Sequence, residues 1–241
     1  MGHALTLDGL EELCWINVDV IRVFLHVFLK FGRMDLYERY IQMPAMTDDA
    51  AHHTAEYTLA GFPGAIGSTD ATHIQIEWLP AWFKMSHKAR TYNVTVNHRR
   101  QFLSSTPGHP ARWNDKILAT LDDFMQKMYR GATFGECVFE LYDYKTNANN
   151  NAKIIVKRQY RGAWLLVDNG YLAWPTTVPP IKSTTNLSEI RFSTWLESMR
   201  KDVECTFGIL KGRFRVLKTG IRLAGTESAD NMFMTCCALH N

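Results

Sequence analysis

Three acidic residues occur where a strand or a helix would carry them into the interior of the protein. Asp70 lies in a run of small, β-branched and apolar residues, Asp168 ends the most apolar run of the chain, and Glu204 follows 36 positions later in a predicted helix. A charged carboxylate in apolar surroundings is costly unless it is paired with a positive group or coordinates a cation. These three acids are therefore the leading candidates for chemistry.

Carboxylates that lie together repel one another, and a divalent cation removes that repulsion. Hard oxygen ligands select Mg²⁺ or Mn²⁺ over zinc. Two such ions, held by aspartates at a separation of about 3.5–4 Å, stabilise both the attacking and the leaving oxygen of a phosphoryl transfer. The acids therefore indicate metal-dependent chemistry on a phosphodiester.

Each acid also has a purely structural alternative. Asp168 precedes Asn169 and Gly170, so it could serve only to form a turn. Glu204 could pair with Arg200, which lies one helical turn earlier at i−4. Sequence spacing alone leaves these alternatives open.

Basic residues gather in two blocks that the formal net charge of +3 conceals. Residues 84–116 hold seven Lys and Arg against one acid, and residues 200–222 hold seven against two, whereas residues 1–60 hold four against nine. Such clustering is expected where a polyanion binds, although a single basic run is more often a solvated face. The candidate contacts to a nucleic acid are Arg99, Arg100, Arg200, Lys211 and Arg213.

The elements that must position these residues begin after a helical leader. Apolar residues recur at three- and four-residue spacing over 7–57, with Gly32 as a predicted stop and a second short helix over 34–41. The period changes after the turn residues 61–64. We therefore predict an N-terminal helical extension at residues 1–60 and one main domain at 61–241.

Strand-like and helix-like segments alternate through the main domain. Its first predicted strand runs from Ala65 to Leu79, and the polar residues His98 to Arg100 join the next two strands as a hairpin. This order favours the α/β class with a mixed sheet. The remaining predicted strands are 91–97, 101–106, 139–144, 153–159 and 163–167, and the predicted helices are 114–128 and one that is capped by Ser193 and ends near Lys211.

Composition excludes several classes of protein. With 46% hydrophobic residues and nearly balanced charges, the chain is neither disordered nor fibrous. Five scattered cysteines do not form a small disulfide scaffold and favour a reducing compartment. Charged residues interrupt the apolar stretch 18–31, so it is too short for a membrane span, and no signal peptide opens the chain. We expect a nuclear or cytoplasmic protein.

Five motifs over about residues 57–241 together resemble one known family, the PIF/Harbinger transposases and Harbinger-derived nucleases. The resemblance implies an RNase H-like mixed sheet flanked by helices, and a DDE-type acidic site that acts on DNA. The motifs are Gly-x-x-Asp-x-Thr-His at 67–73, Pro-Gly with a downstream Asn-Asp at 107–115, Val-Asp-Asn-Gly-Tyr at 167–171, Arg-x-x-Val-Glu-x-x-Phe-Gly-x-Leu-Lys-x-Arg-Phe at 200–214, and the terminal Cys-Cys-Ala-Leu-His-Asn.

The resemblance also implies roles for individual residues. It makes Asp70, Asp168 and Glu204 the catalytic triad and adds Asp115 as a fourth metal ligand. The implied activity is two-metal cleavage or transfer of DNA strands with Mg²⁺ or Mn²⁺, with a separate Myb-like protein for DNA targeting and with a homo-oligomer as a further expectation. The alternatives are a domesticated, catalytically silent module that binds DNA or protein, and a nuclease that acts on RNA.

Overall fold

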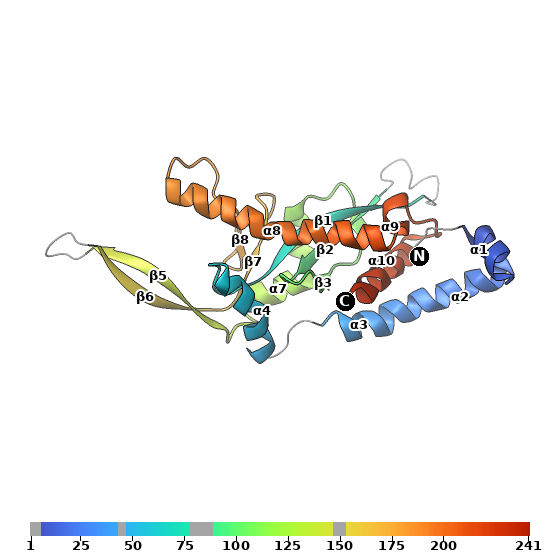
Figure 1. Cartoon of the computed structure of the whole chain (residues 1–241), viewed down its shortest axis with the longest axis horizontal. Coiled ribbons are helices and arrows are strands. Elements are labelled where there is room, and N and C mark those ends of the chain that lie inside the picture. The colour runs from blue at the N-terminus through green and yellow to red at the C-terminus, as the bar shows by residue number, and fades with distance from the viewer. Residues whose placement is uncertain (1–5, 43–46, 78–88, 147–152) are drawn as a thin grey trace.

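A mixed β-sheet forms the centre of the computed structural model, which describes residues 6–42, 47–77, 89–146 and 153–241 (Figure 1). The strand order is β3-β2-β1-β7-β8, and β4 also pairs with β2. Strand β1 is antiparallel to β2 and parallel to β7, which confirms the predicted mixed α/β fold. The strands are β1 (Ala65–Gln75), β2 (Ala89–Val96), β3 (Phe102–Ser105), β4 (His109–Pro110), β7 (Trp164–Leu166) and β8 (Thr177–Val178).

Helices cover both faces of this sheet. Neighbouring residues of a strand point to opposite faces, and on β2 the ring of Tyr92 stacks on Phe233 at a centroid distance of 3.9 Å, whereas the Asn93 amide donates to Asp122. The first face therefore packs against the C-terminal helices and the second against the helices that follow β4. The former are α8 (Leu187–Arg213), α9 (Val216–Thr219) and α10 (Thr226–His240), and the latter are α6 (Asp115–Leu121) and α7 (Asp123–Tyr129).

Two strands stand apart from the central sheet. Strands β5 (Val138–Thr146) and β6 (Lys153–Arg161) pair in antiparallel register as a ribbon that projects at one end of the molecule (Figure 1). This ribbon confirms the two strands predicted there. Beyond it, β7 lies between β1 and β8 with Leu165 and Leu166 fully buried, as the continuous apolar run predicts.

The N-terminal helices pack on the same side as α10. They are α1 (Leu7–Cys14), α2 (Val18–Phe31), the π-helical turn η1 (Gly32–Leu36), α3 (Tyr37–Tyr40) and α4 (Thr47–Leu59). The predicted stop at Gly32 is wrong, because Gly32 is helical and the chain continues through η1 into α3. A Cβ atom at Gly32 would lie 2.3 Å from the Thr235 hydroxyl, so this glycine serves close packing against α10. The domain boundary at residue 60 stays a prediction.

Two helix boundaries also differ from the sequence prediction. The single helix expected over 114–128 is interrupted at Asp122, whose carboxylate accepts from the Met125 amide and caps α7. The long helix α8 begins six residues before Ser193, with Asn186 as its N-cap.

The last residues of the predicted first strand, 78 and 79, lie outside the described residues. None of the described helices is long and apolar enough to span a bilayer.

Candidate active site

The parallel pairing of β1 and β7 brings two of the predicted acids side by side. Ser68 of β1 pairs with Leu166 of β7. Asp70 stands two residues further along β1, and Asp168 lies two residues beyond the end of β7. The pairing therefore brings the two acids to the same end of neighbouring strands, and the charge of Asp168 acts on Asp70.

Gly170 shows how closely a third acid approaches. Asp115 begins α6, and a Cβ atom built on Gly170 would lie 2.4 Å from an Asp115 carboxylate oxygen and 3.0 Å from an Asp168 oxygen. The two oxygens can therefore be no further apart than the sum of those distances. The Gly170 amide also donates to Asp168 at 2.7 Å, which fixes the Asp168 carboxylate in this place. The absence of a side chain at position 170 allows the two acids to converge.

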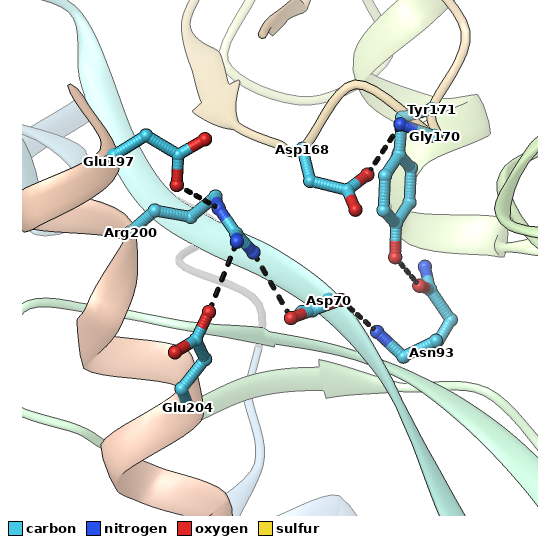
Figure 2. A network of polar contacts seen from close by, with 9 residues as sticks. Asp70, Asn93, Asp168, Gly170, Tyr171, Glu197, Arg200 and Glu204 are labelled. Carbon is cyan, nitrogen blue, oxygen red and sulfur yellow. Dashed lines mark hydrogen bonds and ion pairs between the residues drawn. The ribbon is translucent and has the colours of Figure 1, made fainter. Parts of the chain in front are cut away.

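Arg200 joins the fourth acid to the cluster (Figure 2). Its guanidinium donates to Asp70 at 3.1 Å and to Glu204 at 3.0 Å, and it also contacts Glu197 at 3.4 Å. The Arg200 side chain is only 11% exposed, against 51% for Glu204. The structural alternative for Glu204, an ion pair with Arg200 at i−4, is therefore present in this structure, and the same arginine bridges Glu204 to Asp70.

The pKa values report the convergence of the acids. Burial raises the pKa of Asp70 above its ordinary value, and the charge of Asp168 adds to this rise while Arg200 opposes it. Burial followed by the charge of Asp168 also raises the pKa of Asp115. Burial of Tyr171 raises the pKa of its phenol, with Asp70, Asp115 and Asp168 as further causes. The charges of the three aspartates therefore all act on the Tyr171 phenol.

A buried network of hydrogen bonds holds the Tyr171 side chain in place. The Tyr171 hydroxyl donates to the Asn93 side chain, and the Asn93 amide donates to Asp122 at 2.7 Å. Burial raises the pKa of Asp122 to about 6. Sequence analysis missed Asn93 and Asp122. Asn93 could have been singled out, because it is an amide inside a predicted strand, and an amide that becomes buried requires hydrogen-bond partners.

Three of the five basic candidates contact groups other than the predicted site acids, and a fourth, Arg100, is exposed. Arg99 pairs with Glu56 at 2.8 Å near the β2–β3 hairpin tip, where Arg100 is exposed. Lys211 donates to a β1 carbonyl at 3.4 Å and Arg213 to an α10 carbonyl at 3.2 Å. Within the part of the chain that the structure describes, Arg200 is the one predicted DNA contact that forms ion pairs with predicted site acids.

The donors suit a hard divalent cation, but they do not form a complete ligand set. Asp70, Asp115 and Asp168 supply carboxylate oxygens, the donors that Mg²⁺ and Mn²⁺ prefer. Among the described residues, however, no group of three or more acidic, His or Cys side chains is already arranged to hold a metal ion. Arg200 explains part of this, because its guanidinium lies between Asp70 and Glu204. The chemistry of the donors therefore fits the ion, and the roles of the four acids stay predictions.

The chain belongs to the DDE superfamily endonuclease family, whose model matches residues 69–241. This match covers well over half of the chain and includes Asp70, Asp115, Asp168 and Glu204, so it confirms the resemblance found in the motifs. The central sheet with its flanking helices is consistent with the RNase H-like fold that the resemblance implies.

One curated relative supports the same assignment. The chain is 23% identical over 192 residues to a Xenopus laevis protein named "Putative nuclease HARBI1". The similar region covers 77% of this chain and 48% of the relative, so the chain spans about half of that protein's length. No solved structure matches the chain.

Proposed function

We propose that this chain is the catalytic domain of a divalent-metal-dependent DNA endonuclease or transposase, which cuts or transfers phosphodiester strands. The observation that carries the proposal is the close approach of Asp115 and Asp168 beside Gly170, together with the charge of Asp168 that acts on Asp70 of β1. Asp168 raises the pKa of both Asp70 and Asp115, as expected where like charges are held close together. Family membership adds support for a nuclease.

In such a reaction the residues of the chain would have separate roles in binding metal and substrate. Asp70, Asp115 and Asp168 would hold the metal ions, and Glu204 would join them when its bond to Arg200 opens. Bound divalent ions supply Lewis-acid activation of water or a 3′-hydroxyl and stabilise the leaving oxygen. Gly170 keeps the Asp168 carboxylate oriented, and Arg200, when released from Glu204, is placed to contact a phosphate of the substrate.

DNA is the substrate that the charge distribution supports best. The basic block at residues 200–222 begins on α8 beside the acidic cluster and continues through α9. A phosphate backbone that follows this block would be led to the carboxylates, since basic clusters concentrate polyanions. An RNA substrate would use the same phosphate contacts and is distinguished by substrate competition in the assay below.

Cleavage of supercoiled DNA tests the proposal. Incubation with Mn²⁺ or Mg²⁺ is expected to give nicked or linear DNA, and Asp168→Asn is expected to lower the rate by at least about a hundredfold, because a ligand and a charge are lost while the shape is kept. Asp143→Asn is the matched control, since Asp143 lies on the projecting ribbon and pairs only with exposed Arg158 among the described side chains. Equal cleavage by the Asp168 variant would contradict the proposal.

One observation favours a second function, a silent DNA-binding module. Arg200 already neutralises Asp70 and Glu204, so these acids have a structural partner that requires no metal ion. In that case the folded protein would bind DNA with a strong salt dependence, would leave the DNA intact in Mn²⁺, and would give no heat on titration with Mn²⁺.

A further inference from the structure

Helix α2 is apolar on two opposite sides, and the fold covers only one of them. On the inner side Leu29 is buried in the main core, with Leu25 and Phe28 packed against it. The outer side carries a stripe of apolar residues at three- and four-residue spacing. We call this stripe the outer face of α2; its members are Val20, Val23, Phe24, Val27, Phe31 and, in η1, Met34, with exposed fractions from 49% to 67%.

Such a helix is expected to be covered on both sides. A helix that is hydrophobic around most of its circumference is normally buried, and contiguous exposed apolar patches mark interaction sites. Figure 1 shows α2 along one edge of the molecule with α10 on its inner side. The spacing of Val20, Val23 and Val27 is that of the a and d positions of a helix–helix seam. The expected occupant is therefore another helix.

The charges beside the stripe point to the same helix in a second copy of the chain. Asp19 lies near the start of α2 and Lys30 near its end, eleven residues apart. At 100° per residue these two side chains are only about 20° apart around the helix axis, so they lie on the same edge of the outer face. The edge is therefore acidic at one end and basic at the other, which makes it complementary to itself in the antiparallel direction.

We propose that the chain forms a two-fold symmetric dimer through the outer faces of two antiparallel α2 helices. With the midpoint at Leu25, Val23 of one copy packs on Val27 of the other. Asp19 and Lys30 then lie at nearly equal distances of about 8 Å from the midpoint, so each Asp19 meets Lys30 of the other copy. A two-fold axis repeats every contact, as isologous interfaces require.

The contacts within one chain leave Asp19 accessible for this role. Its ion pair is with Arg22 at i+3, and both side chains are more than half exposed. Such exposed pairs contribute little to stability, so Asp19 can also accept an ion pair from a partner at small cost. The dimer does not depend on the proposed nuclease activity.

Sedimentation velocity of the whole chain over a wide concentration range tests the dimer. The wild type is expected to show a reversible monomer–dimer equilibrium. The double variant Val23→Asp/Val27→Asp is expected to be monomeric, with the circular dichroism and melting temperature that the wild type has at concentrations where it too is monomeric, because both side chains are exposed in the single chain. A matched control, Val138→Asp/Ile154→Asp on the projecting ribbon, also replaces two exposed apolar residues and should keep the dimer.

Charge exchange identifies the occupant and its direction. Asp19→Lys or Lys30→Asp alone should weaken the dimer about tenfold, because each variant places like charges together twice. The double exchange Asp19→Lys/Lys30→Asp should restore the affinity to within a few-fold of wild type. A monomer at every concentration, a dimer that survives Val23→Asp/Val27→Asp, or a double exchange that fails to restore affinity would each overturn the proposal.

Discussion

The acidic cluster has two parts that the fold stabilises differently. In the first part, Asp70 and Glu204 share Arg200, a nearly buried cation with 11% of its side chain exposed. In the second part, Asp115 and Asp168 lie against Gly170, and among the described residues no basic side chain lies at salt-bridge distance from either acid. One part therefore has a cation at hydrogen-bonding distance, whereas in the other Asp168 accepts from a backbone amide and the charge of His73 acts on Asp115.

This difference indicates where an added cation has the largest effect. Burial lowers the pKa of Arg200, yet Asp70, Glu197 and Glu204 outweigh burial and raise it above its ordinary value. Asp168 also raises the pKa of Asp115, but there the consequence is opposite, because a like charge adds to burial and disfavours the ionised form. A divalent ion is therefore expected to bind first between Asp115 and Asp168, and to compete with Arg200 only afterwards.

The largest effect, a loss of affinity for Mn²⁺, is expected from Gly170→Ala. The added Cβ would lie 2.4 Å from an Asp115 oxygen, so Asp115 must move away from Asp168. We expect the affinity for Mn²⁺ to fall by about tenfold or more, as is typical when the support of metal ligands is disturbed. Calorimetric titration measures this change.

Gly208→Ala is the matched control for this substitution. Gly208 lies in α8, and a Cβ atom there would have no neighbour within 4 Å. The control should fold at least as well as the wild type, because alanine favours a helix, and should bind Mn²⁺ equally. If Gly170→Ala also binds Mn²⁺ like the wild type, the close approach of Asp115 and Asp168 does not matter for the ion.

A smaller effect is expected from Arg200→Gln in the absence of metal. Three carboxylates lose their shared cation, and the free energy of unfolding should fall by about 2 kcal/mol, less than for a fully buried pair because Glu197 and Glu204 are half exposed. Mn²⁺ should then stabilise this variant more than it stabilises the wild type. Urea unfolding with and without Mn²⁺ measures both quantities.

Arg158→Gln provides the comparison for this second prediction. Arg158 pairs with Asp143 on the exposed ribbon, so its loss should change the free energy of unfolding by less than about 1 kcal/mol. An Arg200 variant that resembles this control, or that gains nothing extra from Mn²⁺, would show that Arg200 is not the internal counter-ion of the cluster.

The smallest effect concerns the pH dependence of stability without metal. The raised pKa values of Asp70 and Asp115 mean that the folded state binds their protons more tightly than the unfolded state. Their stabilising contribution is complete below the ordinary value of 3.8 and is lost as the pH rises through the folded pKa. Asp168→Asn removes one cause of this rise, so the variant should be more stable than the wild type near pH 7.

Urea unfolding in a chelator at several pH values measures this difference. The advantage of Asp168→Asn should shrink as the pH falls through the raised folded pKa values of Asp70 and Asp115 and should vanish below their ordinary value of 3.8. The asparagine oxygen can still accept from the Gly170 amide, so the local turn is kept. An advantage that does not change with pH, or a loss of stability at neutral pH, would contradict the predicted coupling.

Much of the fold could be predicted because local periodicity and tertiary environment agree there. The strands of the β2–β3 hairpin, the ribbon and the buried β7 all follow their sequence patterns. Predictions failed where a distant contact decides the local structure. The close approach of Thr235 of α10 requires a glycine at position 32, where the chain stays helical, and the break at Asp122 is stabilised by Asn93 from β2. Neither partner is near in sequence.

The site was predictable in its residue types but not in its contacts. The acids could be chosen because apolar surroundings and motifs single them out. The pairing of Arg200 with Glu204 was available as an i−4 alternative, but its bond to Asp70 joins positions 130 residues apart. The steric role of Gly170 likewise depends on Asp115, which belongs to a different element. Such contacts arise only from the packing of the sheet and its helices.

Calorimetric titration of the metal-free protein with Mn²⁺ tests the central claim most directly, namely that Asp115 and Asp168 hold a divalent ion together. The wild type and the ribbon control Asp143→Asn should bind Mn²⁺ with equal affinity. Asp115→Asn and Asp168→Asn should each lose at least about tenfold in affinity while remaining folded. Equal Mn²⁺ binding by all four proteins, or no binding by the folded wild type, would contradict the claim.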